Sequence, residues 1–217
     1  MNAEADQLDT PRKTQDERRT VRRQAILDAA ESLFLEHGYP CVSLSAIVQR
    51  SGGSLATIYQ MFGNKQGLLR AVVDRNTDES LKDLDTLLAS GLPPRRILEE
   101  FAISYLAFAT TPRKIAFMRL VITESLTDPD FGEAFDRDMQ MKYVARIASL
   151  FEHWNTNGLA RIDRPRQAAE LYLAILLCNL PIRFMLGRPP ESTSREDTIW
   201  RLACFLDRFG MEAEARA

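Results

Sequence analysis

The chain has 217 residues, which leaves room for one small and one larger domain. Hydrophobic residues make up 45% of it and charged residues 27%, so the composition excludes a disordered or collagen-like chain. The formal net charge is only −2, but between Arg12 and Arg70 nine Lys and Arg residues stand against five Asp and Glu residues. Phosphate binding depends on such a local surplus of positive charge, although a solvated helix face would show the same pattern.

The N-terminal residues are polar and contain no apolar segment typical of a signal peptide. The longest apolar run, residues 171–182, is too short to span a membrane, so we expect a cytoplasmic protein without membrane contact. The three cysteines have no metal-binding spacing, and Cys178 and Cys204 lie in apolar stretches where core positions are expected. The sequence predicts neither a metal site nor a cofactor.

The N-terminal third predicts three helices that follow a polar segment. Residues 1–17 are expected to be a disordered arm. Apolar residues then recur at helical spacing, which predicts a helix over residues 18–37 that Gly38 ends. Ser43 and Ser54 are expected to cap two short helices, 44–50 and 55–61, because a serine hydroxyl can accept a hydrogen bond from the first helical turn.

The remaining residues also predict helices. A fourth helix is expected from Asn64 to about Leu88, although Gly67 near its start should cost about 1 kcal/mol relative to alanine. Five further helix starts are marked by a capping residue or by a proline suited to the first helical position. These starts are Pro94, Thr111-Pro112, Asp128-Pro129, Asp163 with Pro165, and Thr193 to Glu196. Gly158 and Gly187 are expected to end helices, so the last two would cover about 165–186 and the residues after 193.

These elements predict an all-α fold of about nine helices. Two short helices joined by a glycine-containing turn, after a longer helix, are typical of a helix-turn-helix, in which the second short helix enters the DNA major groove. We therefore expect an N-terminal three-helix head over residues 18–75 that binds DNA, and a C-terminal helical bundle over residues 76–217 for ligand sensing and dimerisation.

The head also resembles the DNA-binding domain of the TetR family of transcriptional regulators. The resemblance is carried by residues 25–30, 33–34, 37–39, 43–48, 51–54, 57–59, Phe62 and 64–65. Met61, Gln66 and Gly67 depart from the residues that the family usually has there. The bundle resembles the helical C-terminal domains of the AcrR/AefR-like branch. The resemblance implies a repressor that binds a palindromic operator as a homodimer and is released by a small apolar effector.

Candidate DNA contacts follow from the chemistry of the head and from this resemblance. Phosphate contacts are expected from Ser43, Tyr59 and Lys65. Lys65 is included because a cation in the first turn of a helix is unfavourable next to the helix dipole unless an anion lies nearby. Base contacts are expected from Ser54, Leu55, Thr57 and Gln60. The basic residues Arg18, Arg19, Arg22 and Arg23 are expected either to contact the DNA backbone or minor groove or to form a solvated arm.

The bundle is expected to hold a mostly apolar ligand pocket between its first helices, although each candidate could equally be a core residue. The candidates are Phe101, Tyr105, Phe108, Phe117, Met118, Arg119, Val121, Ile122, Glu124, Tyr143, His153, Trp154 and Asn179. By resemblance, the last two helices would form a four-helix bundle with a second subunit. The expected interface residues are Leu176, Leu180, Phe184, Ile199, Leu202, Leu206 and Phe209.

Two other classes of function remain open. An enzyme of the helical-bundle type is one, but a di-iron site needs Glu-x-x-His pairs, and Phe34 and Leu150 stand three residues before the two histidines, His37 and His153. A helical scaffold that has lost DNA binding is the other. The presence of Ser43, Tyr59 and Lys65 argues against a scaffold, because a protein that does not bind DNA has no need of phosphate-contacting residues at these positions.

Overall fold

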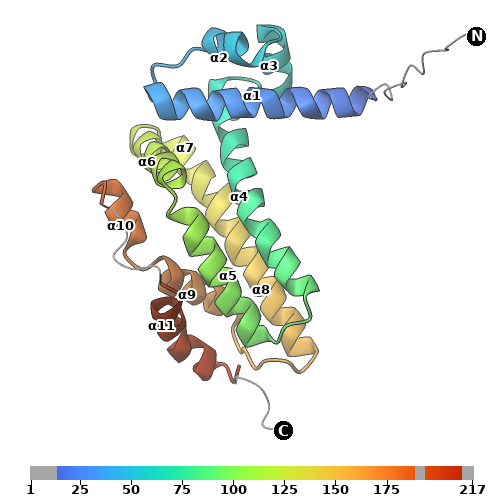
Figure 1. Ribbon diagram of the computed structural model, residues 1–217, viewed down its shortest axis with the longest axis vertical. Coiled ribbons are helices and arrows are strands. Elements are labelled where there is room, and N and C mark those ends of the chain that lie inside the picture. Colours follow the sequence, from blue (N-terminus) through green and yellow to red (C-terminus); the bar gives the residue numbers. More distant parts are fainter. Residues whose placement is uncertain (1–13, 189–193, 212–217) are drawn as a thin grey trace, which may run out of the picture.

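The structure is a computed structural model that describes residues 14–188 and 194–211. Within these residues every regular element is a helix, which confirms the predicted all-α class. A small head lies at one end, and a longer helical body extends away from it (Figure 1). Among the described helices, none combines the length and the apolar character that crossing a membrane would require.

Three helices and the start of a fourth form the head. They are α1 (Gln15–His37), α2 (Leu44–Ser51), α3 (Leu55–Phe62) and α4 (Lys65–Ala89). α1 begins three residues before its predicted start, because Thr14 and Glu17 form a reciprocal capping box. The predicted disordered arm is therefore helical at residues 15–17, and its first 13 residues lie outside the described part of the chain.

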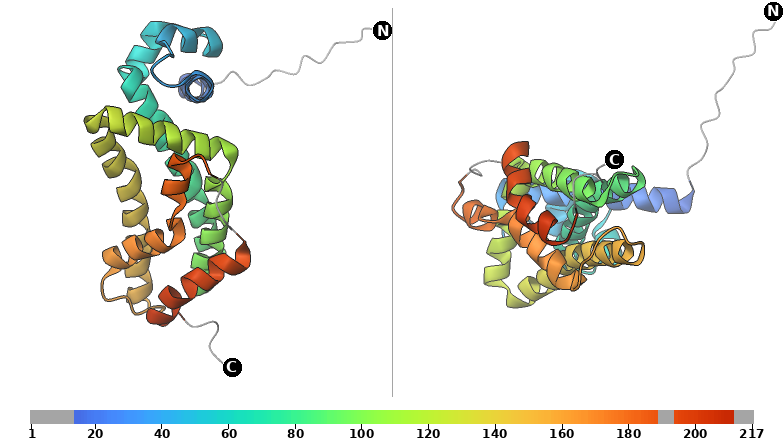
Figure 2. Two further views of the ribbon diagram at one scale, coloured as in Figure 1. Left: turned by 90° about the vertical axis from the view of Figure 1, so that its left-hand side faces the viewer. Right: turned by 90° about the horizontal axis from the view of Figure 1, so that it is seen from below.

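α4 runs from the head into the body, where α5 packs along it and α8 is joined to it by hydrogen bonds from Lys142 and Arg146 (Figure 1). The body elements are α5 (Pro94–Ala109), α6 (Pro112–Thr127), α7 (Pro129–Phe135), the π-helical turn η1 (Asp136–Gln140), α8 (Met141–Thr156), α9 (Pro165–Leu177), α10 (Leu180–Met185) and α11 (Arg195–Arg208). α6 lies across the top of the body beneath α1, as Figure 2 shows. The head therefore rests on α6 as well as on α4.

Two predicted helices are interrupted. The helix expected after Asp128 contains the π-helical turn η1, whose hydrogen bonds reach one residue further along the chain than those of an α-helix. The helix expected over residues 165–186 is two helices, because Cys178 has a φ of +45° and the chain turns there. Pro181 explains the break, since its nitrogen cannot donate to the carbonyl of Leu177 and its ring would clash with it. α11 is capped by Ser194; the predicted cap, Thr193, lies outside the described residues.

Two apolar clusters form the core. The lower cluster joins α5, α8, α9, α10 and α11 to the far half of α4. The upper cluster fills the head, but it also contains Phe117 and Val121 of α6 and Phe131 of α7. Because α6 and α7 contribute side chains to the core of the head, a movement of either helix would displace residues of that core.

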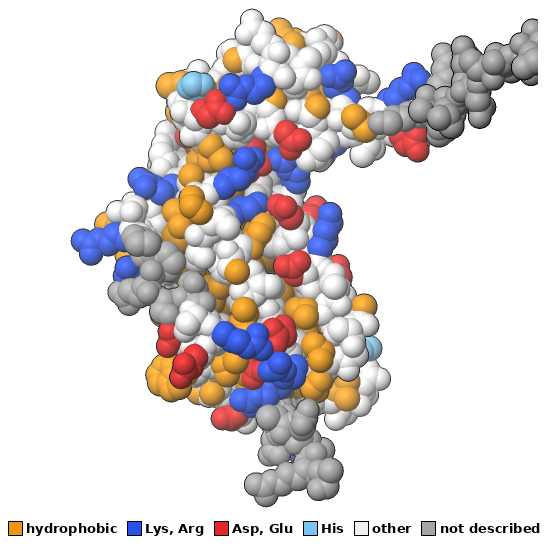
Figure 3. Space-filling view, viewed as in Figure 1, with side chains coloured by type: hydrophobic (Ala, Val, Ile, Leu, Met, Phe, Trp, Pro, Cys, Tyr) orange, Lys and Arg blue, Asp and Glu red, His pale blue; other side chains and the backbone are white. Residues whose placement is uncertain are grey.

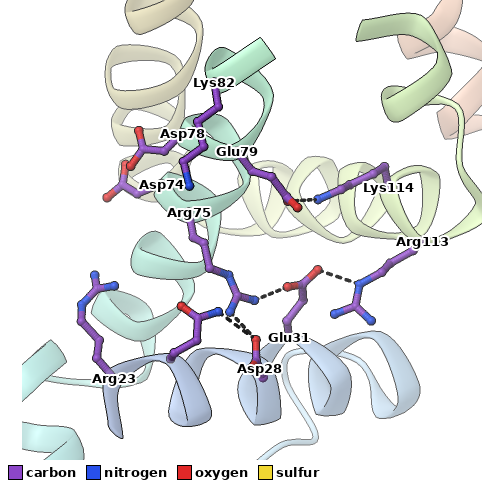
Figure 4. A pocket seen from close by; sticks show the side chains of 11 residues that line it. Arg23, Asp28, Glu31, Asp74, Arg75, Asp78, Glu79, Lys82, Arg113 and Lys114 are labelled. Carbon is purple, nitrogen blue, oxygen red and sulfur yellow. Dashed lines mark hydrogen bonds and ion pairs between the residues drawn. The ribbon is translucent and has the colours of Figure 1, made fainter. Parts of the chain in front are cut away.

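A buried carboxylate reinforces this contact between head and body. Glu31 of α1 is buried, and it accepts hydrogen bonds from Arg75 of α4 and, at 3.1 Å, from Arg113 of α6 (Figure 4). Arg75 also binds Asp28 on the preceding turn of α1. The charges lie beside an open cleft of about 750 Å³ between the three helices. One acidic side chain thus fixes α1 to both helices on which the head rests.

We expect Glu31→Gln to lower the free energy of unfolding by about 2 kcal/mol, because a buried ion pair that loses one charge leaves its partners uncompensated. The loss is smaller than for a fully buried pair, since Arg75 keeps Asp28 and Arg113 is about half exposed. Chemical denaturation at matched protein concentration measures it. The control, Glu36→Gln, removes an exposed partner of Arg50 and should leave stability unchanged. Equal effects of the two substitutions would contradict the proposed role of Glu31.

The structure explains why position 67 is a glycine, which the sequence alone does not. It lies in the first turn of α4, where its N–H donates to Asn64 at 2.8 Å. A Cβ atom at this position would lie 2.0 Å from the backbone oxygen of Phe62, at the end of α3. The close approach of α3 and α4 therefore requires glycine, and the predicted advantage of alanine at this position is wrong.

Gly67→Ala should therefore destabilise the protein by about 2 kcal/mol through steric overlap, instead of stabilising the helix. Thermal or chemical unfolding measures the change. Arg70→Ala, at an exposed position one turn further along α4, is the matched control and should leave stability almost unchanged. An alanine variant at position 67 as stable as the wild type would show that the two helices can separate without cost.

Candidate functional site

The turn between α2 and α3 is built for a sharp change of direction. Gly52 and Gly53 have φ values of +75° and +96°, which residues with a side chain rarely adopt. The guanidinium of Arg22 on α1 packs against both glycines and donates to the carbonyl of Ser51 at 3.1 Å. Arg22 therefore holds the end of α2, a role that the sequence did not indicate. α2 and α3 form the expected helix-turn-helix.

α3 buries one side and exposes the other. Ile58 is fully buried in the head, whereas Tyr59 is 54% exposed and Leu55 and Gln60 are also exposed. Ala56 shares this exposed stripe, although its small side chain carried no signal in the sequence. A short helix with a polar and apolar stripe facing solvent can enter a DNA major groove.

The predicted base-contacting residues Ser54 and Thr57 already have partners. Ser54 caps α3 by accepting from the N–H of Thr57 at 3.2 Å, and the two hydroxyls lie 3.0 Å apart. Thr57 is half-buried. Ser54 and Thr57 therefore help to shape the start of α3, and Ser54 is exposed as Leu55, Tyr59 and Gln60 are.

The predicted phosphate contacts Ser43 and Lys65 lie at helix N-termini. Ser43 is exposed and caps α2, with its hydroxyl accepting from Ala46 at 3.1 Å. Lys65 begins α4; its ammonium donates to the carbonyl of Pro40 at 3.3 Å and lies 4.3 Å from the centre of the Tyr39 ring. The loop before α2 therefore lies beside the start of α4. Burial lowers the pKa of Lys65, while Glu124 acts in the opposite direction.

The four arginines of α1 differ in their surroundings. Arg18 and Arg19 are exposed on the part of α1 that extends beyond the head (Figure 1). Arg23 lies 5.5 Å from the centre of the Phe62 ring, so it packs on the end of α3. Arg22 contacts the turn between α2 and α3. Arg18 and Arg19 are thus the two that most resemble a solvated arm.

The body contains a partly open, mostly apolar cavity of about 250 Å³. It is lined by Asn76, Thr77, Tyr105, Phe108, Ala109, Lys114, Phe117, Met118, Ile122, Phe135, Met139, Gln140, Tyr143, Leu177, Pro181 and Phe184. Both interruptions of the predicted helices, the π-helical turn and the break between α9 and α10, contribute residues to this lining. The irregular backbone therefore lies where the body is hollow.

Some of the predicted pocket residues line this cavity: Tyr105, Phe108, Phe117, Met118, Ile122 and Tyr143. The other candidates do not line it. Phe101 and Trp154 lie in the lower core and Val121 lies in the core of the head. Arg119, His153 and Asn179 lie elsewhere on the body. Glu124 is near Lys65 and Asp128, and burial raises the pKa of its carboxyl group.

Periodicity could not separate these groups, because cavity wall and core both present apolar residues at helical spacing. One missed residue did carry a signal. Lys114 lies in the first turn of α6, where a cation opposes the helix dipole, and the same argument singled out Lys65.

Few polar groups face the cavity. The hydroxyl of Tyr143 is hydrogen-bonded to Ser80, and its ring meets that of Tyr105 edge to face at 5.7 Å between centres. Burial raises the pKa of both phenols, so both keep their protons at neutral pH. The ammonium of Lys114 binds Asn76 and, at 3.0 Å, Glu79 of α4 (Figure 4).

The predicted dimer residues are largely used within one chain. Leu176, Leu180, Leu202, Leu206 and Phe209 are buried in the lower core, and Phe184 is buried beside the cavity. Their apolar surface is therefore largely covered within one chain. Ile199 is half-buried. Helical periodicity shows that a helix has an apolar stripe but not which neighbour covers it.

Other apolar side chains of the same helices are exposed. Trp200 is 78% exposed, and Leu171, Ile182, Met185 and Leu186 are also at the surface of α9, α10, α11 and the residues that follow α10. Positive and negative side chains are interspersed over the body in Figure 3, with apolar ones between them. A contiguous patch of exposed apolar residues is typical of an interaction surface, whereas single exposed apolar residues are normal on a monomer.

The cysteines Cys178 and Cys204 also lie at the surface, so the prediction that they are core residues is wrong. Cys178 terminates α9, and Cys204 lies one turn after Trp200 on α11. Among the described residues, no group of three or more His, Cys, Asp and Glu side chains is placed to hold a metal ion.

Two family models match this sequence. Residues 26–72 match a model described as bacterial regulatory proteins of the tetR family. Residues 96–209, more than half of the chain, match a model described as the C-terminal domain of AefR-like transcriptional repressors. The first match covers the helix-turn-helix, and the second covers most of the body.

Individual proteins are similar over different parts of the chain. The transcriptional repressor ComR of Escherichia coli is 48% identical over 56 residues, which is 26% of this chain and 27% of ComR. The transcriptional repressor AcnR of Corynebacterium efficiens is 26% identical over 177 residues, covering 79% of this chain and 86% of AcnR. High identity is thus confined to a short segment, whereas weaker similarity extends through the body.

Solved structures show the same architecture. A TetR-family transcriptional regulator from Mesorhizobium loti has a TM-score of 0.75 at 21% identity, covering 91% of this chain and 99% of the other. The flavonoid-responsive regulator FrrA has a TM-score of 0.68 at 27% identity, covering 87% of this chain and 96% of FrrA. The arrangement of head and body is therefore one that known regulators share.

Proposed function

Because this chain belongs to the TetR family of transcriptional regulators, we propose that it binds operator DNA as a homodimer and is released from the operator by a small effector. The family match identifies it as a transcriptional repressor of the helix-turn-helix type and not as an enzyme. Three features of this function are particular to the chain: the residues that contact DNA, the face that pairs with a second copy, and the place where the effector binds.

The observation that carries the proposal is the exposed stripe of α3. Leu55 and Gln60 would contact base edges, and Gln60 is suited to adenine, whose N6 and N7 atoms it can pair with through two hydrogen bonds. Ser43 and Lys65 would bind phosphates from the N-termini of α2 and α4, where backbone N–H groups also favour anions. Tyr59 is exposed enough for its phenol to reach a phosphate.

Dimerisation would use the exposed face of α9, α10 and α11 in place of the buried residues predicted from the sequence. Trp200, Ile182 and Leu186 provide a large aromatic and two aliphatic side chains, which suit the centre of an interface. A two-fold axis through this face would present two heads to one side of a duplex. The two half-sites would then lie about 34–36 Å apart, one helical turn of DNA.

The effector would occupy the apolar cavity of the body. α6 separates this cavity from the head: Met118 and Ile122 line the cavity, while Val121 lies in the core of the head. Arg113, at the start of α6, binds Glu31 of α1. An occupant that shifts α6 would therefore move the head, and operator DNA would weaken effector binding by the same factor. α4, which runs from the head into the body, offers a second connection.

Another connection lies at the far end of α6. Gln66 of α4 donates to Asp128, the cap of α7, at 2.7 Å. A glutamate, which the family usually has at this position, would instead repel Asp128. The departure at Gln66 thus fits a direct contact between the start of α4 and the α6–α7 junction.

To test the DNA contacts, the preferred operator would first be selected from random DNA with the purified protein. Tyr59→Phe and Lys65→Ala should each weaken binding by about 1 kcal/mol on every sequence, because phosphate contacts carry no base information. Lys65→Ala should also reduce the slope of log affinity against log salt concentration by about one. Electrophoretic or fluorescence titrations at several salt concentrations measure both effects.

Gln60→Ala should behave differently and relax the preference at one base position by about 1–3 kcal/mol. Arg166→Ala removes an exposed positive charge at the start of α9, in the body; it is the control and should change neither affinity nor preference. A large change of preferred site in Tyr59→Phe or Lys65→Ala would contradict the phosphate contacts. Binding that is insensitive to salt would contradict the DNA interface as a whole.

To test the dimer face, Trp200→Glu places a charge where an aromatic side chain would be covered. It should weaken self-association by about 2 kcal/mol or more, as expected for an interface tryptophan. Sedimentation velocity measures the change. Leu159→Glu, at another exposed leucine between α8 and α9, is the matched control and should remain dimeric. A wild type that is monomeric at micromolar concentration, or a dimeric Trp200→Glu variant, would refute this interface.

A further inference from the structure

We propose that the cavity of the body binds a small aromatic carboxylate, and that Lys114 is the partner of its carboxylate group. The proposal rests on the proposed function, since it names the chemical class of the effector. It depends on three features of the cavity: the charge of its wall, the free capacity of Lys114 and the number of aromatic rings.

The wall of the cavity carries charge of one sign. Among the described residues that line it, Lys114 is the charged one, and none is an Asp or Glu. The Lys114 side chain is only 13% exposed, so its charge is weakly screened by solvent. The two tyrosines add no negative charge, because burial raises the pKa of Tyr105 and Tyr143 and keeps both phenols neutral. Lys114 also borders the open cleft beside Glu31, where its ammonium is paired with Glu79, so an anion in the cavity would have to share or replace this partner.

Lys114 has capacity for a further partner. An ammonium group has three donors, and those of Lys114 bind Asn76 and Glu79 within the described residues. Glu79 lies outside the cavity wall and its side chain is 58% exposed. Its carboxylate can thus be hydrated when a ligand binds Lys114, so that the exchange costs little. A carboxylate bound to a lysine in a largely apolar site gains a charge-assisted hydrogen bond.

The rest of the wall selects for a flat ring. Six aromatic side chains line the cavity: Tyr105, Phe108, Phe117, Phe135, Tyr143 and Phe184. Such rings pack against another ring by offset or edge-to-face contacts. The volume of about 250 Å³ is below the lower end of the range of about 300–1,000 Å³ that drug-sized ligands occupy. A compound of one or two rings fits this size.

Aromatic cavities also bind quaternary ammonium groups, and this is the main alternative class. Lys114 argues against it. Its ammonium already lies 4.2 Å from the centre of the Phe108 ring, the position that a bound cation would take. A second cation would be repelled by Lys114, and the described wall offers no carboxylate to neutralise it.

Calorimetric titration of the full-length protein tests the proposal. The probes are benzoate, cinnamate and 2-naphthoate, the primary amide of each, and benzyltrimethylammonium. We expect at least one carboxylate to bind about tenfold more tightly than its amide, because only the carboxylate gains the charged contact with Lys114. The amides have the same rings, so they isolate the contribution of charge.

Three variants assign the effect. Lys114→Gln should abolish the difference between carboxylate and amide while leaving the affinity for the amide within about twofold. Lys114→Arg should keep the preference for the carboxylate, because the charge remains. Lys142→Gln, which removes an exposed lysine outside the cavity, should behave as the wild type. Circular dichroism checks that each variant is folded, and if Lys114→Gln is not, the arginine variant and the wild-type titrations decide.

The proposal is overturned if no carboxylate binds more tightly than its amide, if Lys114→Gln retains the difference, or if benzyltrimethylammonium binds most tightly. DNA binding without any probe is measured on the same samples. A protein that binds its selected DNA but prefers no carboxylate remains a regulator with another effector class. A protein that binds carboxylates but no DNA would refute the proposed function and leave the ligand site standing.

Discussion

The arrangement of this protein depends on one buried carboxylate. Glu31 lies on the inner side of α1, where Leu27, Ala30 and Phe34 form the core of the head, and it is balanced by Arg75 from α4 and Arg113 from α6. A buried charge is tolerated only when it is paired and hydrogen-bonded, so the three helices must keep this geometry. Since α3 is packed in the same core as α1 and α4, the orientation of the exposed stripe of α3 follows from the same constraint.

The cavity of the body is bordered by two interruptions of regular α-helix. The π-helical turn η1 contributes Met139 and Gln140 to its wall, and Leu177 and Pro181 lie on either side of the break between α9 and α10. α6 closes the cavity on the side of the head. Neighbouring residues of α6 serve the cavity and the head core, and Phe117 belongs to both, so a ligand at the proposed site would lie directly beside the head core.

The helices α10 and α11 each have an apolar side that is buried in the monomer and an apolar residue that is exposed. Leu202 and Leu206 of α11 are buried in the lower core, whereas Trp200 on the opposite side is exposed. In α10, Phe184 is buried beside the cavity and Ile182 is exposed. Apolar residues on every side of these helices are explained if the inner faces fold the monomer and the outer faces pair with a second copy.

The sequence by itself determined the features that depend on neighbouring residues. Helix caps, prolines at first helical positions and turn glycines act within a few residues of the chain. The head helices, the α2–α3 turn and the helix starts of the body could therefore be predicted from the sequence. Tyr59, Gln60 and Lys65 could be named because short helices in a helix-turn-helix have a fixed relation to each other, and the family resemblance supplied their roles.

Only the tertiary structure decided which partner covers each apolar or charged side chain. Leu176 and Phe101 have the spacing of interface and pocket residues but lie in the core, and Gly67 looks unfavourable until the carbonyl of Phe62 is seen beside it. Glu31, Arg75 and Arg113 are far apart in the sequence, and so are the walls of the cavity. The physical reason is that periodicity reports the direction of a side chain on its own helix, whereas burial, pairing and cavity formation depend on which other helix lies opposite.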